Sequence, residues 1–239
     1  MGVGRWGCWA FSCIAVVLWV PLSAWGGNWD ISIAGFGGLS QPWSRAFEWS
    51  MPGVLDITGK NVSFQSSAVL GGKLTFWSLT PHGVDPVNFG IELEAFQFRP
   101  TIKMQSVSAD GTALGMPVAG TLTFNVPFDL QTEIYSLNFL VRYPIGVSSD
   151  LPSGRFNVYL GPGAGVQMTR LRQPGVGDAH DTTPMVQGLV GARLFLVSHV
   201  SVFTEYKYTH AHQSFDSAGS QYKFNLDSNH FLAGASVHF

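Results

Sequence analysis

Cysteine is nearly absent from this 239-residue chain, because Cys8 and Cys13 are the only two and both lie close to the N-terminus. The residues after them have no thiol, which excludes disulfide bonds and cysteine-based metal sites from the rest of the chain. Charge is scarce too: 12% of the residues are charged, whereas soluble domains contain about a quarter. Lys and Arg number 13 against 15 for Asp and Glu, so the basic excess that favours nucleic-acid binding is missing.

Long apolar runs are missing as well. After residue 26, no apolar segment reaches the ~20 residues that a membrane-spanning helix needs. Even so, 46% of the residues are hydrophobic and 13% are aromatic. High apolar content without apolar runs indicates that apolar and polar residues alternate, as they do in β-strands with two different faces.

The first 26 residues have the layout of a secretory signal peptide. Arg5 precedes an apolar run from Trp9 to Val20, and the small residues Ser23 and Ala24 follow it. The run holds about a dozen residues, which is too short to cross ~30 Å of hydrocarbon as a helix. We therefore expect residues 1–26 to be removed during export, and residues 27–239 to form one mature domain.

Eight stretches with a period of two follow the leader, and they are rich in aromatic, β-branched and small residues. They span residues 28–40, 68–79, 87–98, 130–143, 155–169, 185–197, 200–211 and 222–239. Each reaches the ~9–11 residues of a tilted transmembrane strand. The gaps alternate between long and short, as extracellular loops and periplasmic turns do in bacterial barrels. The pattern predicts an all-β fold: an eight-stranded antiparallel up-and-down transmembrane β-barrel with both termini in the periplasm.

The charges of these stretches gather on one face. When the more apolar half of each stretch is assigned to lipid, the inward half contains equal numbers of acidic and basic residues. An eight-stranded barrel is only wide enough for its own side chains. We therefore predict a salt-bridge network across the lumen instead of an open channel. Its predicted members are Asp30, Lys73, Glu92, Glu94, Arg142, Arg193, Glu205 and Lys207.

Four apolar residues conflict with a polar lumen. Phe96 and Phe98 fall on the inward side of the third stretch, and Phe224 and Leu226 break the pattern of the last one. A β-bulge near each pair is the expected explanation, because an inserted residue shifts the alternation.

Four segments resemble the outer membrane β-barrel domain family of opacity-like and OmpA-like small porins: NWDISIAGFGG, LGGKLTFWSL, FTEYKYTHAHQSF and SNHFLAGASVHF. The resemblance covers the whole mature chain and implies location in the outer membrane. It also implies a C-terminal signal for the barrel assembly machinery, which maps to Phe231, Ala233, Ala235, Val237 and Phe239. The implied partners are periplasmic chaperones, outer membrane lipids and lipopolysaccharide; no nucleic acid and no cofactor is implied.

A rival hypothesis rests on histidines near the outer end of the penultimate stretch. His210, His212 and Ser214 resemble the His-x-Ser pair of lipid A deacylases, and alternation places all three on the lipid-facing side. Asp216 or Asp227 would orient the base of such a site. A metal site of His210, His212 and the loop residue His180 is a weak alternative, because a histidine pair on a strand needs a third ligand from a separate loop. No metal site is predicted.

The sequence therefore favours a small, non-enzymatic outer membrane barrel with a structural, envelope-integrity or surface-adhesive role. Its working parts would be the long loops, residues 41–65 and 101–127, which mix apolar residues with glycine and proline. A narrow channel for small hydrophobic solutes is the alternative, and a lipid A hydrolase is the third hypothesis.

Overall fold

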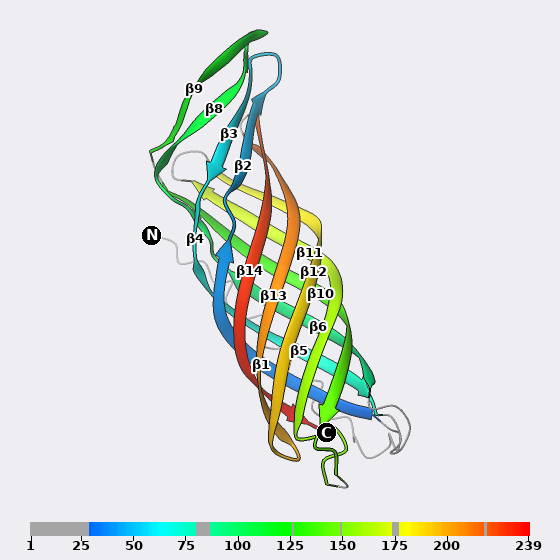
Figure 1. Ribbon diagram of the computed structural model, residues 1–239. Helices are drawn as coiled ribbons and strands as arrows, with labels where there is room; N and C mark the ends of the chain where they lie inside the picture. The colour runs from blue at the N-terminus through cyan, green and yellow to red at the C-terminus, as the bar shows by residue number, and fades with distance from the viewer. Residues whose placement is uncertain (1–28, 80–86, 126, 149, 174–176, 218) are drawn as a thin grey trace, which may run out of the picture.

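A computed structural model describes residues 29–79, 87–125, 127–148, 150–173, 177–217 and 219–239 (Figure 1). The predicted signal peptide lies outside these residues. The described chain is built from antiparallel strands. None of its segments is a helix long and apolar enough to cross a membrane.

Eight strands close into a ring, in which every strand pairs with the next one along the chain. They are β1 (Trp29–Pro42), β5 (Ser67–Ser78), β6 (Asn88–Phe98), β10 (Phe128–Ile145), β11 (Phe156–Gln173), β12 (Gly177–Val197), β13 (Val200–Ser217) and β14 (Ser220–His238). The last strand pairs with the first, from Ser32 opposite His238 to Pro42 opposite Ser228. This confirms the predicted eight-stranded antiparallel barrel, whose closure removes the unpaired edges from its wall.

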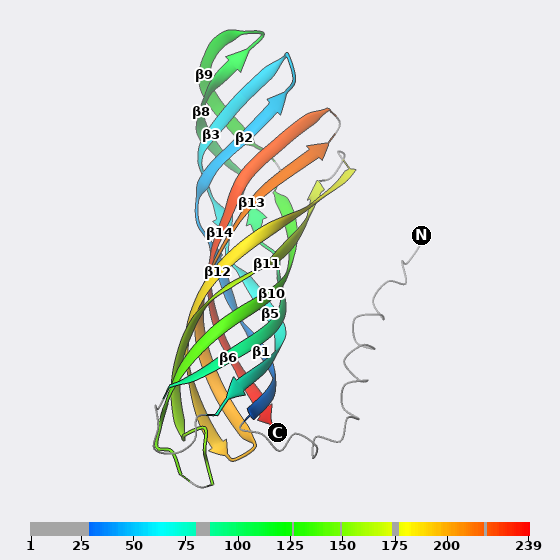
Figure 2. The same ribbon diagram turned by 90° about the vertical axis from the view of Figure 1, so that its right-hand side faces the viewer.

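The two predicted long loops fold into further strands. Their elements are β2 (Arg45–Met51), β3 (Leu55–Val62), β4 (Phe64–Gln65), β7 (Thr101–Ile102), β8 (Gln105–Ala113) and β9 (Met116–Phe124). β2 pairs with β14 over Gln221–Phe224, and β3, β8 and β9 continue the sheet outward in that order. Figure 2 shows this sheet standing beyond the ring as an extension of the barrel wall, at the end opposite the C-terminus. We call it the extracellular sheet, after the predicted orientation with the termini in the periplasm.

Three barrel strands extend further than the sequence pattern predicted. β11 continues to Gln173, β12 begins at Gly177, and β13 continues to Ser217. The predicted loops there are therefore mostly paired strand. On β13 the outer wall of the extension is polar, because His212 and Ser214 occupy it. Without apolar residues on the outside, the alternation used to recognise a membrane strand disappears.

The outer wall of the ring carries an apolar belt. On β10 the outward side chains are Tyr135, Leu137, Phe139, Val141 and Tyr143, all of them exposed. The residues between them are buried inside the barrel. An exposed apolar surface of this extent, bounded by tyrosines, is the surface that lipid covers in transmembrane barrels.

The predicted bulges are wrong. Phe96 and Phe98 pair in unbroken register with both neighbouring strands, and Phe224 and Leu226 pair regularly with β13. All four side chains point inward and are at most 4% exposed. The alternation of inward and outward residues continues without a shift, and what changes along the strand is the chemistry of each face.

Candidate functional site

Five charged residues form an ion-pair layer inside the barrel: Lys73, Glu92, Glu94, Glu205 and Lys207. Lys73 Nζ lies 2.6 Å from Glu205 Oε2 and 3.2 Å from Glu92 Oε2. Lys207 Nζ lies 3.1 Å from Glu205 Oε1 and also contacts Glu94. Every one of these side chains is fully buried. They come from β5, β6 and β13, so the network joins opposite sides of the ring.

Neutral side chains complete the hydrogen bonding of the three glutamates. Thr75 Oγ1 donates to Glu92 at 2.9 Å, and Tyr159 OH donates to Glu205 at 3.0 Å. Asn138 Nδ2 donates to Glu92 at 3.0 Å, while Gln187 Nε2 donates to Glu94 at 3.1 Å.

Sequence reasoning missed these four donors, Thr75, Asn138, Tyr159 and Gln187, because it followed charge alone. The sequence signal that could have identified them is the alternation along each strand, which places all four on the inward face. Together with the lysines, they provide the hydrogen bonds that buried carboxylates require.

Asp30 is the centre of a second group, nearer the periplasmic end. Arg142 Nη1 and Ser153 Oγ each lie 2.7 Å from Asp30 Oδ2. His238 Nδ1 lies 2.7 Å from Asp30 Oδ1, and its Nε2 lies 2.8 Å from the Ser201 hydroxyl. The group links β1, β10, β13 and β14 close to the point where the chain's last strand meets its first.

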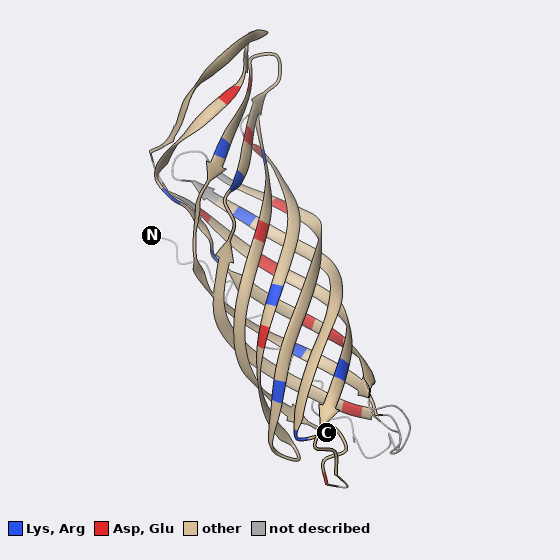
Figure 3. Ribbon diagram, viewed as in Figure 1, with Lys and Arg blue, Asp and Glu red and all other residues tan. Residues whose placement is uncertain are grey.

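Arg193 is buried inside the barrel but stands apart from the other seven residues of the predicted network. Its guanidinium lies 5.7 Å from the centre of the Tyr159 ring and 5.9 Å from that of Phe203. Within the described part of the chain, its nitrogens have no hydrogen-bond partner. Figure 3 shows how the lysines, arginines and acids are distributed over the barrel strands.

The extracellular half of the lumen is mainly apolar, with a few buried polar side chains such as Gln167 and Gln213. Phe96 stacks on Phe98 with ring centres 6.3 Å apart, and the His230 ring packs edge-on against both, at 5.3 Å and 5.0 Å. Farther out, Phe224 contacts Phe215 at 5.8 Å and Phe47 at 5.7 Å. The five phenylalanine rings belong to one continuous buried cluster, which we call the apolar plug.

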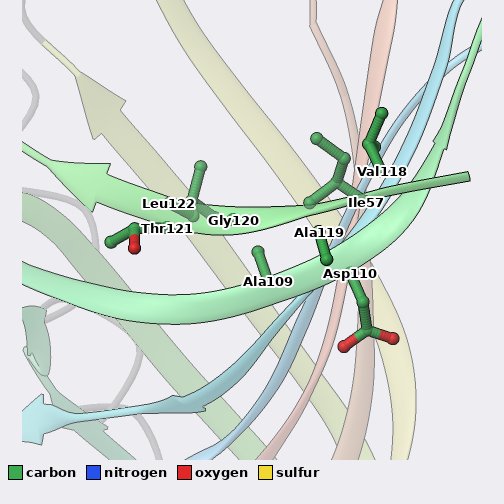
Figure 4. A pocket seen from close by; sticks show the side chains of 8 residues that line it. All are labelled: Ile57, Ala109, Asp110, Val118, Ala119, Gly120, Thr121 and Leu122. Atoms are coloured by element: carbon green, nitrogen blue, oxygen red, sulfur yellow. The ribbon is translucent and has the colours of Figure 1, made fainter.

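The extracellular sheet ends at β9. This strand pairs with β8 on one side, and from Met116 to Thr123 its other edge has no strand partner among the described residues. Its sequence, MPVAGTLTF, contains no charged residue, and it is exposed from Met116 to Thr121. A hollow of about 160 Å³ lies beside it (Figure 4), lined by Ile57, Ala109, Asp110, Val118, Ala119, Gly120, Thr121 and Leu122.

The histidines of the hydrolase hypothesis lie on the outer wall of β13. His210 Nδ1 contacts Asp227 Oδ1, directly across from it on β14. The other oxygen of Asp227 accepts a hydrogen bond from Arg45 Nε at 2.6 Å. Of the two candidate acids, Asp227 therefore contacts a histidine, whereas Asp216 accepts a hydrogen bond from Gln221.

The nucleophile of that hypothesis is not joined to either histidine. His212 Nδ1 lies 2.8 Å from Asn225 Oδ1, and Ser214 stands opposite Lys223. Within the described residues, no hydrogen bond connects the Ser214 hydroxyl to His210 or His212. Among the described residues, no three His, Cys, Asp or Glu side chains converge on a possible metal position. His180 therefore does not join His210 and His212 in such a group.

The residues of the predicted C-terminal signal share one face of β14. Phe231, Val237 and Phe239 are about half exposed on the outer wall, and Ala233 and Ala235 lie between them on the same face. Their role in assembly stays a prediction.

A solved bacterial outer membrane protein has a similar fold. OprG from Pseudomonas aeruginosa superposes with a TM-score of 0.52 and 16% sequence identity, over 89% of this chain and 96% of that one. The fold is that of an outer membrane β-barrel. Neisserial surface protein A (TM-score 0.43, 12% identity, 89% of this chain and 98% of that one) and the protease OmpT from Escherichia coli (0.45, 8%, 90% and 98%) also align. No protein-family model and no curated protein sequence matches the chain.

Proposed function

We propose that this barrel is a non-enzymatic surface protein, which binds an extended segment of another protein along the open edge of its extracellular sheet. The observation that carries the proposal is the edge of β9. Exposed sheet edges are normally protected by charges, bulges or cover, because their free N–H and C=O groups pair with other strands. Over nine residues β9 has no charged side chain and only Pro117 as a blocking residue. Strand addition is a common mode of peptide recognition.

The position of the edge supports the same reading. β9 is the outermost strand of a sheet that begins at β14 and passes through β2, β3 and β8. The hollow beside it is lined by Val118 and Leu122 together with Ile57. A strand added to β9 would place alternate side chains near this hollow, which gives some selectivity for apolar residues.

The filled lumen argues against the channel hypothesis. The ion-pair layer, the Asp30 group and the apolar plug occupy successive levels of a barrel that is narrow by its strand number. We assign the paired charges a structural role, in which they tie opposite walls together. The separation of Ser214 from its would-be base argues against the hydrolase.

The test is a binding measurement on the purified barrel in lipid nanodiscs. An array of uncharged nine-residue peptides rich in Val, Thr and Ile serves as the probe. Each peptide is paired with a version carrying proline at alternate positions, which removes the backbone donors needed for strand pairing. We expect binding of the unmodified peptides and at least tenfold weaker binding of the proline versions.

Two variants locate the binding. Thr121→Lys places a charge on the open edge of β9 and should weaken binding at least tenfold. Thr112→Lys adds the same charge to β8, which is paired on both sides at that position, and should leave binding unchanged. An equal loss of peptide binding in both variants would contradict strand addition at β9. So would proline peptides that bind as tightly as the unmodified peptides.

A further inference from the structure

The outer wall of β13 and β14 changes from apolar to polar at a defined level. Tyr206 and Phe231 are opposite each other, and their ring centres are 5.3 Å apart. The next outward pair is Tyr208 with Asn229, and then His210 with Asp227. Aromatic residues mark the boundary between hydrocarbon and headgroups in membrane proteins. The His210–Asp227 pair therefore lies at the level of the outer-leaflet headgroups.

Asp227 is a buried carboxylate held between two partly exposed nitrogen groups. Its side chain is 3% exposed, whereas those of Arg45 and His210 are 39% and 44% exposed. Arg45 Nε and Nη2 lie 2.6 Å and 2.5 Å from Asp227 Oδ2, and His210 Nδ1 contacts Oδ1. The Tyr208 hydroxyl also interacts with Asp227 and Arg45. Among the described residues, His210 Nε2 has no hydrogen-bond partner, and the half-exposed Arg45 guanidinium remains accessible to a ligand.

An aromatic surface borders the same group. Trp43 is 46% exposed, and the Arg45 guanidinium lies 5.3 Å from the centre of its ring. The Trp43 ring is 6.1 Å from that of Tyr208. Its backbone N–H donates to the carbonyl oxygen of Asp227 at 2.8 Å. The ring and the two nitrogen groups are therefore held in fixed relation on one patch of the barrel wall.

We propose that Trp43, Arg45, His210 and Asp227 form a binding site for the phosphorylated sugar headgroup of an outer-leaflet lipid. Arg45 presents the planar guanidinium that matches a phosphate. His210 Nε2 accepts a hydrogen bond from a sugar hydroxyl when the ring is neutral, and donates to phosphate when it is charged. Trp43 offers its face to the sugar ring. Asp227 is a positioning residue that orients Arg45 and His210.

The competing explanation is that this cluster only fastens the start of the extracellular sheet to β14. Fastening requires the contacts to Asp227 but no phosphate. The two explanations therefore differ in whether the protein distinguishes a phosphorylated lipid from the same lipid without phosphate. The proposal does not depend on peptide binding at β9, which is a different surface.

The experiment is native mass spectrometry of the folded full-length mature barrel, released from micelles containing lipid A. Bisphosphorylated lipid A is compared with dephosphorylated lipid A of the same acyl chains. We expect the wild-type barrel to retain the phosphorylated lipid at least tenfold more tightly. Arg45→Gln should abolish this preference. Arg99→Gln removes an exposed charge from another part of the wall and should preserve it.

Equal retention of both lipids by the wild-type barrel would overturn the proposal. An Arg45→Gln barrel that is less stable yet keeps the wild-type preference for phosphorylated lipid A would also overturn it. That result would mean that the cluster only attaches the extracellular sheet to β14. If Arg45→Gln does not fold, which a missing heat-dependent shift of the band on a gel would reveal, His210→Gln decides. This variant should fold and lose at least threefold in preference, and an unchanged preference would reject the site.

Discussion

The membrane part of this barrel and its extracellular part use the same strands with opposite chemistry. On β13, the membrane part has Tyr206 outside and Glu205 inside. Beyond the boundary the same strand has His212 outside and Phe215 inside. The membrane part is thus apolar outside and charged inside, and the extracellular part is polar outside and apolar inside. The surrounding medium decides which face is apolar, while the pairing of β13 with β14 runs through both parts without a shift in register.

This comparison explains why the lumen has two kinds of filling. Where lipid covers the outer wall, the apolar residues are used outside and the inward positions are left for charges, which must then pair with one another. Where water covers the wall, the inward positions are apolar and close-pack, as in an ordinary soluble sheet protein. Phe224 and Leu226 belong to this second part.

The largest expected effect comes from breaking the ion-pair layer. Lys207→Met should destabilise the barrel by about 3–5 kcal/mol, because Glu94 and Glu205 would lose a buried partner. Urea unfolding of the barrel in lipid vesicles measures the change. The control is Lys60→Met, which breaks the exposed pair with Asp110 and should cost no more than about 1 kcal/mol. Similar losses in both variants would mean that the layer contributes no special stability.

A smaller effect should come from placing charge on the outer wall at two levels. Phe139→Lys puts a charge between the two tyrosines that bound the belt on β10, and should destabilise the barrel by about 2–4 kcal/mol. His212→Lys makes a comparable change above the boundary and should alter stability by less than about 0.5 kcal/mol. The same unfolding measurement compares them. If His212→Lys costs as much as Phe139→Lys, the boundary lies higher than the Tyr206–Phe231 pair.

The smallest effect, and one of opposite sign, is expected for Arg193→Met. Arg193 is buried, and the described residues give it no hydrogen-bond partner. Replacement by an apolar side chain of similar length removes the desolvation cost of the charge without stranding an acid. Unfolding should show a change between zero and a gain of about 1 kcal/mol. A loss of more than about 2 kcal/mol would show that Arg193 is paired in the folded protein.

The sequence alone predicted the number of barrel strands, their order and the side of the wall on which most residues lie. It could do so because lipid on one side imposes a period of two that is visible in a single strand, as in Tyr135 to Tyr143. It also led to a prediction of which charges face inward, since a charge that faces lipid would be costly. The same reasoning failed at Phe96 and Phe98, where it assumed one polarity along the whole strand.

What only the tertiary structure decided is how these residues meet. Two of the four lysine–glutamate pairs join residues that are more than a hundred positions apart, Lys73 with Glu205 and Lys207 with Glu94. The isolation of Arg193, the open edge of β9 and the joining of Arg45 to Asp227 depend in the same way on the register between strands. A local pattern gives the face on which each residue lies, because the backbone of its own strand sets that face. The residue's contact partner is set instead by closure of the ring and by the folding of the two long insertions onto the ring.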